Sequence, residues 1–218
     1  MSPYSAATVA SRREAARREA ARRRSLTRRR VILGAIAVAA VVLAAIAINP
    51  LFHKAVNEFS LPLAHQELIR QQAAEKHLDP ALIAAVIYAE TKFDPRPSSA
   101  GAQGLMQILP DTALFLARRS GAKTFNTADL GTPRVNIAYG SYYLRYLLDE
   151  YGGSVVPALA AYNGGEANVH RWLARARAAG HPLRESDIPF PETRAYVDRV
   201  LWAQQQYRRA YPTELGYA

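Results

Sequence analysis

A nearly uninterrupted apolar run, Ala81–Ala89, constrains the fold of this chain more than any other part of its sequence. Asp79 before the run is a good helix N-cap, and Pro80 suits the first helical turn. Asp94-Pro95 marks a point by which the helix must have ended. We therefore predict a helix over Pro80–Thr91 whose apolar face is buried in the core.

Glu90 lies at the end of this predicted helix and is the first candidate for chemistry. At helical spacing it shares one face with Ile83, Val86 and Ile87. A carboxyl group on an apolar face loses hydration, which disfavours its charged form and raises its pKa. A carboxylic acid that is still protonated near neutral pH is what general acid catalysis needs. The alternative is a solvated Glu at a helix end, because most glutamates are exposed.

The rest of the chain after Pro62 is also predicted to be helical, since it contains no sustained alternation of β-branched residues. Glycine and proline residues separate seven candidate helices. These helices are expected at roughly His65–His77, Pro80–Thr91, Asp111–Ser120, Val135–Tyr151, Val155–Tyr162, Ala167–Ala179 and Thr193–Tyr211. About 155 residues of this composition can bury one adequate core, so we predict one all-α domain over residues 63–218.

The strongly basic character of the chain belongs to its N-terminal tail. The formal charge is +10, of which the ten Arg and two Glu of residues 1–30 account for +8. A basic chain can indicate a nucleic-acid partner, but here the charge directly precedes an apolar run. We therefore do not expect nucleic-acid binding. The tail is either a helix along an anionic membrane surface or a solvated arm.

Val31–Ile48 is a run of 18 residues without a charge, near the minimum length for a membrane-spanning helix. The arginines that precede it predict a cytoplasmic tail over residues 1–30 and an exterior location beyond a connector over residues 49–62. A cleaved signal peptide is the alternative, because Ala45-Ile46-Ala47 fits a small-residue cleavage site. The long basic region and the long apolar run favour an uncleaved, single-pass anchor.

Metal and cofactor chemistry are not expected. The five histidines show no metal-ligand spacing, and the segment Gly101-Ala102-Gln103-Gly104 matches no common phosphate-binding loop. The chain has no Cys, which excludes disulfides and a lipid-modified cysteine.

Five short motifs follow one another along the predicted helical domain. They are Glu90-Thr91-Lys92-Phe93-Asp94-Pro95, the loop Ser99–Pro110 with Gly104-Leu105-Met106-Gln107, Asn136-Ile137 with Gly140 and Tyr143-Leu144, Ala160-Ala161-Tyr162-Asn163-Gly164-Gly165, and Ile188-Pro189-Phe190-Pro191-Glu192-Thr193-Arg194-Ala195-Tyr196-Val197. In order and spacing they resemble the soluble-type lytic transglycosylase (SLT) domain, a lysozyme-like family that cleaves peptidoglycan. The resemblance covers roughly Pro62 to Tyr211 and implies a goose-type lysozyme-like helical fold.

Glycoside cleavage usually needs two carboxyl groups, and the sequence shows no obvious second one near Glu90. Asp94 precedes Pro95, which suits a turn, and Glu166 is expected to begin a helix, where a carboxylate favours the dipole. Glu192 also precedes a predicted helix start. The resemblance implies that none is needed, because lytic transglycosylases work with a single catalytic Glu.

The resemblance also implies a mechanism for Glu90. The protonated carboxyl donates to the glycosidic oxygen between N-acetylmuramic acid and N-acetylglucosamine, and an oxocarbenium-like centre forms. The resulting carboxylate then removes the proton of the muramic C6 hydroxyl, which attacks C1 and closes a 1,6-anhydro ring. No water is consumed, so the enzyme is a lyase.

Six further residues are expected to bind substrate by the same resemblance: Ser99, Met106, Gln107, Tyr162, Asn163 and Glu192. From the residues alone, Met106 is more typical of a core, and Asn163 of a left-handed helix cap. Two positions depart from the family pattern. Thr91 stands where Ser is usual but keeps the hydroxyl, and Gln103 stands where an apolar residue is common.

Three functions follow from these observations. The leading hypothesis is a membrane-anchored peptidoglycan lytic transglycosylase that acts on glycan strands on the extracellular or periplasmic side of the cell membrane. Cell-wall synthesis or secretion machinery is a candidate partner. A hydrolytic muramidase on the same fold would need a positioned water and a second carboxylate, such as Asp94 or Glu192. A non-catalytic protein that only binds the cell wall is the third hypothesis.

Overall fold

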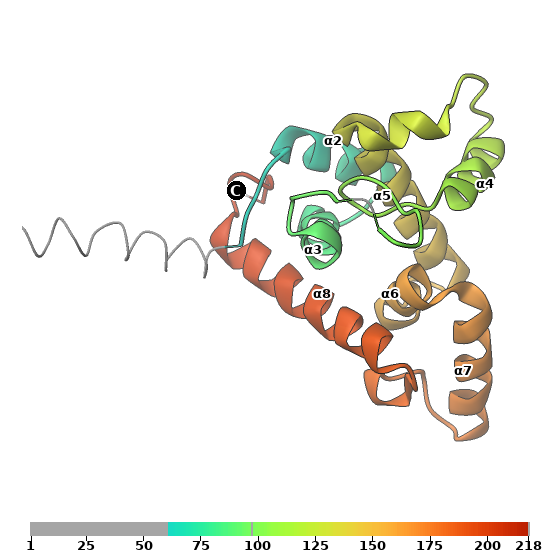
Figure 1. Cartoon of the computed structure of the whole chain (residues 1–218). Helices are drawn as coiled ribbons and strands as arrows, with labels where there is room; N and C mark the ends of the chain where they lie inside the picture. The colour runs from blue at the N-terminus through green and yellow to red at the C-terminus, as the bar shows by residue number, and fades with distance from the viewer. Residues whose placement is uncertain (1–60, 97, 218) are drawn as a thin grey trace, which may run out of the picture. The chain divides into compact units, whose positions relative to one another are not determined.

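The computed structural model describes residues 61–96 and 98–217 (Figure 1). Its helices are α2 (Gln66–Lys76), α3 (Pro80–Thr91), α4 (Pro110–Ser120), α5 (Pro133–Glu150), α6 (Val155–Gly164), α7 (Glu166–Ala178) and α8 (Pro191–Ala210), with short 3₁₀ turns η1 (Thr127–Gly131) and η2 (Glu185–Asp187). Each of the seven predicted helices is therefore present. Among the described residues the only β-type pairing is an isolated bridge between Gln103 and Ile108.

The central helix, α3, begins and ends where its capping residues require. The side chain of Asp79 accepts a hydrogen bond from the N–H of Ala81, and Pro80 occupies the first turn. At the other end Lys92 adopts a left-handed φ of 52° and its N–H closes the last turn on the carbonyl of Tyr88. Phe93, also left-handed at φ 64°, then turns the chain away from the helix axis.

Helix α3 supplies the middle of the core. All residues of Ala81–Ile87 are buried, with at most 3 % of any of them exposed. Figure 1 shows α3 between α2 and the long helix α8, which runs beside it, while α5, α6 and α7 follow one another on the other side of the domain. The partly buried Glu90 is carried on the final turn of this rigid element, so its backbone position is set by the core.

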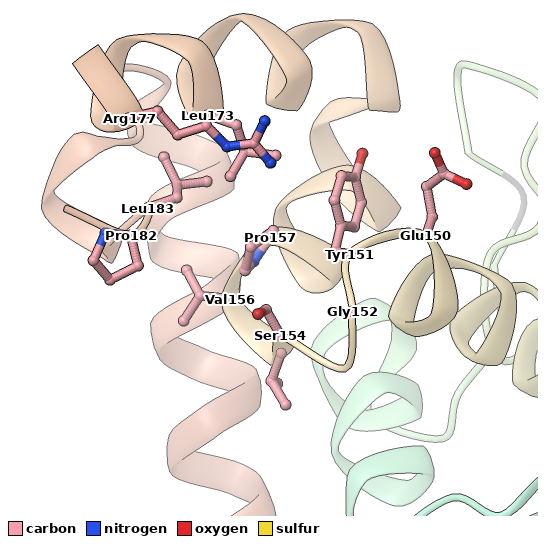
Figure 2. A pocket seen from close by; sticks show the side chains of 11 residues that line it. Glu150, Tyr151, Gly152, Ser154, Val156, Pro157, Leu173, Arg177, Pro182 and Leu183 are labelled. Carbon is pink, nitrogen blue, oxygen red and sulfur yellow. The ribbon is translucent and has the colours of Figure 1, made fainter. Parts of the chain in front are cut away.

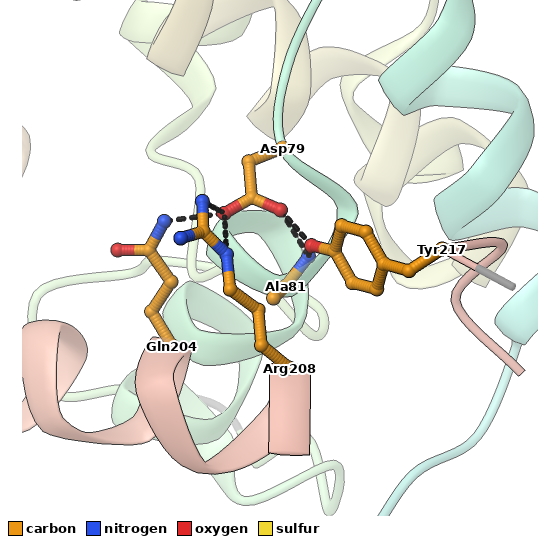
Figure 3. A network of polar contacts seen from close by, with 5 residues as sticks. All are labelled: Asp79, Ala81, Gln204, Arg208 and Tyr217. Carbon is orange, nitrogen blue, oxygen red and sulfur yellow. Dashed lines mark hydrogen bonds and ion pairs between the residues drawn. The ribbon is translucent and has the colours of Figure 1, made fainter. Parts of the chain in front are cut away.

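The start of the described chain and its C-terminal end are held together beside the first turn of α3. The hydroxyls of Tyr207 and Tyr211 donate to the carbonyls of Pro62 (2.5 Å) and Leu61 (2.6 Å). The Asp79 carboxylate gathers Gln204 and Arg208 of α8 together with the Tyr217 hydroxyl (Figure 3). This polar network, which we call the Asp79 network, joins α3, α8 and the C-terminal segment.

The predicted membrane segment Val31–Ile48, the basic tail and most of the connector lie outside the described residues. Within residues 61–96 and 98–217, no helix combines the length and the apolar character that crossing a membrane requires.

Candidate active site

Glu90 lines a cavity of about 410 Å³ at the C-terminal end of α3. The other residues around this cavity are Ala89, Thr91, Lys92, Asp94, Arg96 and Gln107. The volume lies within the range of roughly 300–1,000 Å³ that is typical of ligand pockets. The cavity, hereafter the Glu90 cavity, therefore brings together the predicted acid, the predicted binding residue Gln107 and three further charged side chains.

Burial controls the acidity of Glu90. Loss of hydration raises the pKa of its carboxyl from 4.5 to about 7. The Tyr196 hydroxyl and then the Arg199 guanidinium, both on α8, oppose this rise and lower the pKa. Tyr196 is buried, and its hydroxyl has no partner of ordinary hydrogen-bond geometry among the described residues, so it acts on Glu90 as a nearby dipole. A pKa near 7 makes both protonation states of Glu90 accessible near neutral pH.

The glycine-rich loop between α3 and α4 is positioned by Asn136 of α5. Asn136 is fully buried; its Oδ1 accepts a hydrogen bond from the N–H of Met106 (2.7 Å). Its Nδ2 donates to the carbonyls of Gln103 (2.8 Å) and Leu130 (3.0 Å). Gly104 has a left-handed φ of 71°, and a Cβ there would lie 2.2 Å from the Asn136 amide nitrogen, so the loop can approach α5 only with glycine.

Thr91 joins this loop to the last turn of α3. Its Oγ1 lies 2.8 Å from the carbonyl oxygen of Leu105 and 3.1 Å from that of Ile87. A hydroxyl has one proton, and the shorter contact is the one that crosses from helix to loop. The departure from Ser at this position thus keeps a hydroxyl that fixes the loop beside Glu90.

Gln107 is the predicted binding residue that the structure places next to Glu90. Its backbone has a left-handed φ of 47°, uncommon for a residue with a side chain. Its Nε2 donates to the carbonyls of Gly104 (2.8 Å) and Arg96 (3.2 Å), whereas its Oε1 accepts no hydrogen bond from the described residues. The amide is therefore held by its nitrogen and offers its oxygen as an acceptor.

Met106 and Tyr162 contribute to the site differently from what was expected. The Met106 side chain has no exposed surface and packs against Gly140, where a Cβ would come within 2.4 Å of its sulfur. The expectation that Met106 packs on a sugar does not fit this placement, because the side chain fills the core. The Tyr162 hydroxyl donates to the Met106 carbonyl (2.9 Å), and its ring packs on Tyr143 with centroids 5.2 Å apart. Tyr162 thus supports the loop.

Three other expected binding residues do not line the Glu90 cavity. Ser99 is exposed in a turn, and it is the neighbouring Ser98 whose Oγ accepts a hydrogen bond from the N–H of Ala102 (2.9 Å). Asn163 is exposed within the last turn of α6 and is not the cap of that helix, which is Gly165 with a positive φ of 82°. Glu192 is exposed in the first turn of α8.

The sequence interpretation missed two side chains that act on Glu90, Tyr196 and Arg199. Tyr196 stands within the last motif, four residues after Glu192, which is the residue of that motif expected to bind substrate. The one local signal is helical spacing: Tyr196, Val197 and Val200 form a buried stripe, so Tyr196 faces the core into which α3 packs. Across residues 61–96 and 98–217, no group of three His, Cys, Asp or Glu is arranged to hold a metal ion.

A second cavity, of about 550 Å³, is larger than the Glu90 cavity but lacks its chemistry. It lies between the α5–α6 connection, α7 and the segment after α7, and includes Tyr151, Arg177 and Leu183 (Figure 2). Burial raises the pKa of Tyr151 to about 12, which leaves the phenol neutral at ordinary pH. No group with a shifted pKa near 7 lines it, so the Glu90 cavity is the candidate active site.

Comparison with known families shows which family contains this chain. The model of the "Transglycosylase SLT domain" family matches residues 67–183, and the chain belongs to that family. It is 34% identical over 155 residues to the soluble lytic murein transglycosylase of Escherichia coli K12, covering 69% of this chain and 24% of that protein. It is 32% identical over 171 residues to membrane-bound lytic murein transglycosylase C of Serratia proteamaculans, covering 67% and 48% of the two chains.

Solved structures agree with the family assignment. An inactive Glu-to-Gln mutant of lytic transglycosylase Slt from Pseudomonas aeruginosa superposes with a TM-score of 0.62 at 33% identity, covering 68% of this chain and 24% of that one. The 70 kDa soluble lytic transglycosylase in complex with bulgecin A gives a TM-score of 0.63 at 32% identity, over 68% and 25% of the chains. This chain thus spans about a quarter of the length of its soluble relatives.

Proposed function

We propose that this protein is a peptidoglycan lytic transglycosylase in which Glu90 is the sole acid and base. The bond cleaved is the β-1,4 linkage from N-acetylmuramic acid to N-acetylglucosamine, and the product ends in 1,6-anhydro-N-acetylmuramic acid. The observation that carries this proposal is a single carboxyl group with a pKa near 7 in a ligand-sized cavity beside an anchored loop.

The proposed reaction uses the two protonation states of Glu90 in turn. The protonated carboxyl gives its proton to the glycosidic oxygen as the bond from that oxygen to C1 breaks. Positive charge at C1 is stabilised by the substrate's own N-acetyl group. The Glu90 carboxylate then takes the proton of the C6 hydroxyl while O6 bonds to C1. The Glu90 carboxyl is protonated again at the end of the reaction, and no water is consumed.

The other residues of the cavity support binding. The Gln107 amide oxygen, without a donor among the described residues, is an acceptor for a sugar hydroxyl or acetamido N–H. Tyr162, Asn136 and Thr91 hold the loop that carries Gln107. Relatives support the chemistry. All four proteins compared above are called lytic transglycosylases, and one of these four is described as an inactive Glu-to-Gln mutant. Three expected binding residues lie outside the cavity lining and are proposed to contact more distant sugars of the glycan strand: Ser99, Asn163 and Glu192.

A hydrolytic muramidase is the second candidate, and Asp94 is the observation that favours it. Asp94 lines the same cavity as Glu90, so a second carboxylate is present there. It is exposed and paired with Arg96 at 2.8 Å, which gives it a different role from a buried nucleophile. As a base it would activate water, and the products would then carry reducing ends.

The location proposed for the enzyme is the outer face of a bacterial cell membrane, with the N-terminus in the cytoplasm. The apolar segment Val31–Ile48 and the preceding arginines support it, as do relatives that are called membrane-bound. The test is retention of the full chain in the membrane pellet after an alkaline wash. A chain that lacks Val31–Ile48 or is processed after Ala47 would be recovered in the soluble fraction, and processing of the natural chain would favour the signal-peptide alternative.

The decisive experiment is digestion of purified peptidoglycan by the full chain in detergent, followed by mass spectrometry of the soluble fragments. The variants are Glu90→Gln and Asp94→Asn, with Glu67→Gln as the matched control because Glu67 is exposed on α2, outside the cavity. We expect 1,6-anhydro ends from the natural chain, Asp94→Asn and Glu67→Gln. Glu90→Gln should lose about 10²–10⁴-fold in rate, the usual contribution of general acid–base catalysis.

The other outcomes separate the alternatives. Reducing ends heavier by one water, lost in Asp94→Asn, would establish the muramidase. Binding of glycan without release of fragments by any of the proteins would establish a cell-wall-binding protein without activity.

A further inference from the structure

Three cationic side chains lie near Glu90: Lys92 and Arg96 line its cavity, and Arg199 of α8 acts on its carboxyl from outside that lining. Arg96 forms an ion pair with Asp94, its Nη2 lying 2.8 Å from the carboxylate. Lys92, also on the Glu90 cavity, has no carboxylate within ion-pair distance among the described residues. Within the described residues Arg199 of α8 likewise has no such ion pair, and its guanidinium donates a long hydrogen bond of 3.4 Å to the carbonyl of Ala89, which lines the cavity.

The position of Lys92 is fixed by backbone geometry. It is the left-handed cap of α3, with its N–H bonded to the Tyr88 carbonyl at 3.0 Å, two residues beyond Glu90. The following turn is closed by the N–H of Asp94 on the Thr91 carbonyl at 2.9 Å. The Lys92 side chain is therefore attached to a rigid site at the cavity wall, while its ammonium is an adaptable point charge. A cation at a helix C-terminus also interacts favourably with the helix dipole. That interaction does not explain why the Lys92 side chain lines a cavity.

The proposed substrate is anionic only on alternate sugars. Its glucosamine units are neutral, whereas each muramyl unit carries a lactyl ether that ends in a free carboxylate or in a peptide stem with carboxylates of its own. We propose that Lys92 and Arg199 form a binding site for a carboxylate attached to the muramyl sugar that Glu90 cleaves. This inference rests on the proposed function and makes the charge of the muramyl substituent a determinant of specificity.

The size of the effect follows from the exposure of both side chains. Exposed ion pairs contribute little, which corresponds to about a two- to fivefold change in affinity for each cation. Added salt screens such pairs. The expected signature is therefore a salt-sensitive change in KM, with kcat nearly unaffected for Lys92 because its ammonium would hold the muramyl substituent and not the reacting atoms.

The test compares three substrates: native peptide-bearing strands, the same strands with carboxylates converted to methylamides, and strands stripped of peptide. The full chain is assayed in detergent as the natural protein, Lys92→Gln, Arg199→Gln and Lys123→Gln. Lys123 is the matched control, since it is an exposed lysine in the turn after α4 and lies outside the Glu90 cavity. Binding of each substrate by Glu90→Gln, alone and combined with Lys92→Gln, is measured in parallel.

We expect Lys92→Gln to raise KM about two- to fivefold on charged strands and to leave it unchanged on methylamide strands. If KM rises only on strands stripped of peptide, the group bound by Lys92 is the lactyl carboxylate. If KM rises only on native strands, the bound group is a carboxylate of the peptide stem. Equal KM values for Lys92→Gln and the natural chain, or an equal rise on methylamide strands, would overturn the inference. Absence of cleavage by the natural chain would instead refute the proposed function, and the binding comparison would still decide the role of Lys92.

Discussion

Helix α3 carries one carboxyl group at each end, and the two have opposite surroundings. Asp79, before the first turn, accepts hydrogen bonds from Ala81, Gln204, Tyr217 and Arg208 (Figure 3). Glu90, in the last turn, is neighboured by the Tyr196 hydroxyl, which forms no hydrogen bond of ordinary geometry within the described residues, and burial raises the pKa of the Glu90 carboxyl to about 7.

The comparison teaches how one rigid helix can serve both stability and chemistry. A carboxylate that accepts hydrogen bonds from donors on α8 helps to join α3 to α8. A carboxyl with few donors in a partly dry cavity is destabilised when charged, and it exchanges its proton near neutral pH. The first contributes to folding, and the second weakens the fold above its pKa in return for reactivity.

The largest effect that tests this contrast is the stability of Glu90→Gln in residues 61–218. The folded-state pKa of Glu90 is raised, so the contribution of this group to stability is fully present below about pH 4.5 and is lost as pH rises through about 7. Gln is never ionised. We expect the variant to be more stable at pH 8 by up to about 3 kcal/mol, and equal at pH 4. Chemical denaturation at the two pH values measures the difference.

An equal gain at both pH values would contradict this account, because it would come from packing and not from ionisation. The matched control is Glu67→Gln, whose side chain is exposed on α2. It should leave stability nearly unchanged at either pH.

Asp79→Ala is the second test and should have the opposite sign. The substitution removes the N-cap of α3 and leaves Arg208, which is half exposed, without its carboxylate. We expect a loss of about 2 kcal/mol, mostly from the cap, with activity retained at temperatures where the domain is folded. Asp79→Asn keeps a good cap and should lose less. Similar losses for the two variants would show that the ion pair, and not the cap, dominates the Asp79 network.

The contrast between the two ends also explains which features were predictable from the sequence. All seven helices were predicted because Asp79, Pro80 and the glycines act within a few residues of where they stand. Glu90 was singled out for the same reason, since helical spacing places it on an apolar face. The Asp79 network was not predicted, because Arg208 and Tyr217 reach Asp79 from more than 120 residues further along the chain.

The positions of the other expected site residues could not be predicted, for the same physical reason. Whether Met106 contacts a ligand or the core depends on the space beside Gly140, which lies on another helix. Tyr196 acts on Glu90 only because α8 packs along α3. Of the two adjacent serines, Ser98 and not Ser99 accepts a hydrogen bond from the loop backbone. The turn geometry decides this, and the sequence alone does not show it. Tertiary packing decides each case, and it cannot be predicted from local sequence patterns.

The third test is the pH dependence of kcat/KM, which sharpens the role of α8. An acid with a pKa near 7 gives a profile that falls as pH rises past that value. Tyr196 and Arg199 both lower the pKa of Glu90, so Tyr196→Phe and Arg199→Gln should each move the falling limb to higher pH. The shift should be larger for Tyr196→Phe, because the hydroxyl is the stronger of the two influences. A falling limb that moves to lower pH in either variant would contradict the conclusion that Tyr196 and Arg199 lower the pKa of Glu90.

The smallest effect concerns Thr91, next to Glu90. Thr91→Val keeps the shape of the side chain but removes the hydroxyl that donates to the Leu105 carbonyl at 2.8 Å. We expect a loss of about 1 kcal/mol and a moderate fall in kcat, because the loop that presents Gln107 is no longer tied to the helix. Thr91→Ser retains the donor and should change neither by a measurable amount. If Thr91→Val behaves like the natural chain and Thr91→Ser does not, the methyl group and not the hydroxyl matters, and the loop must be held by Asn136 and Tyr162 alone.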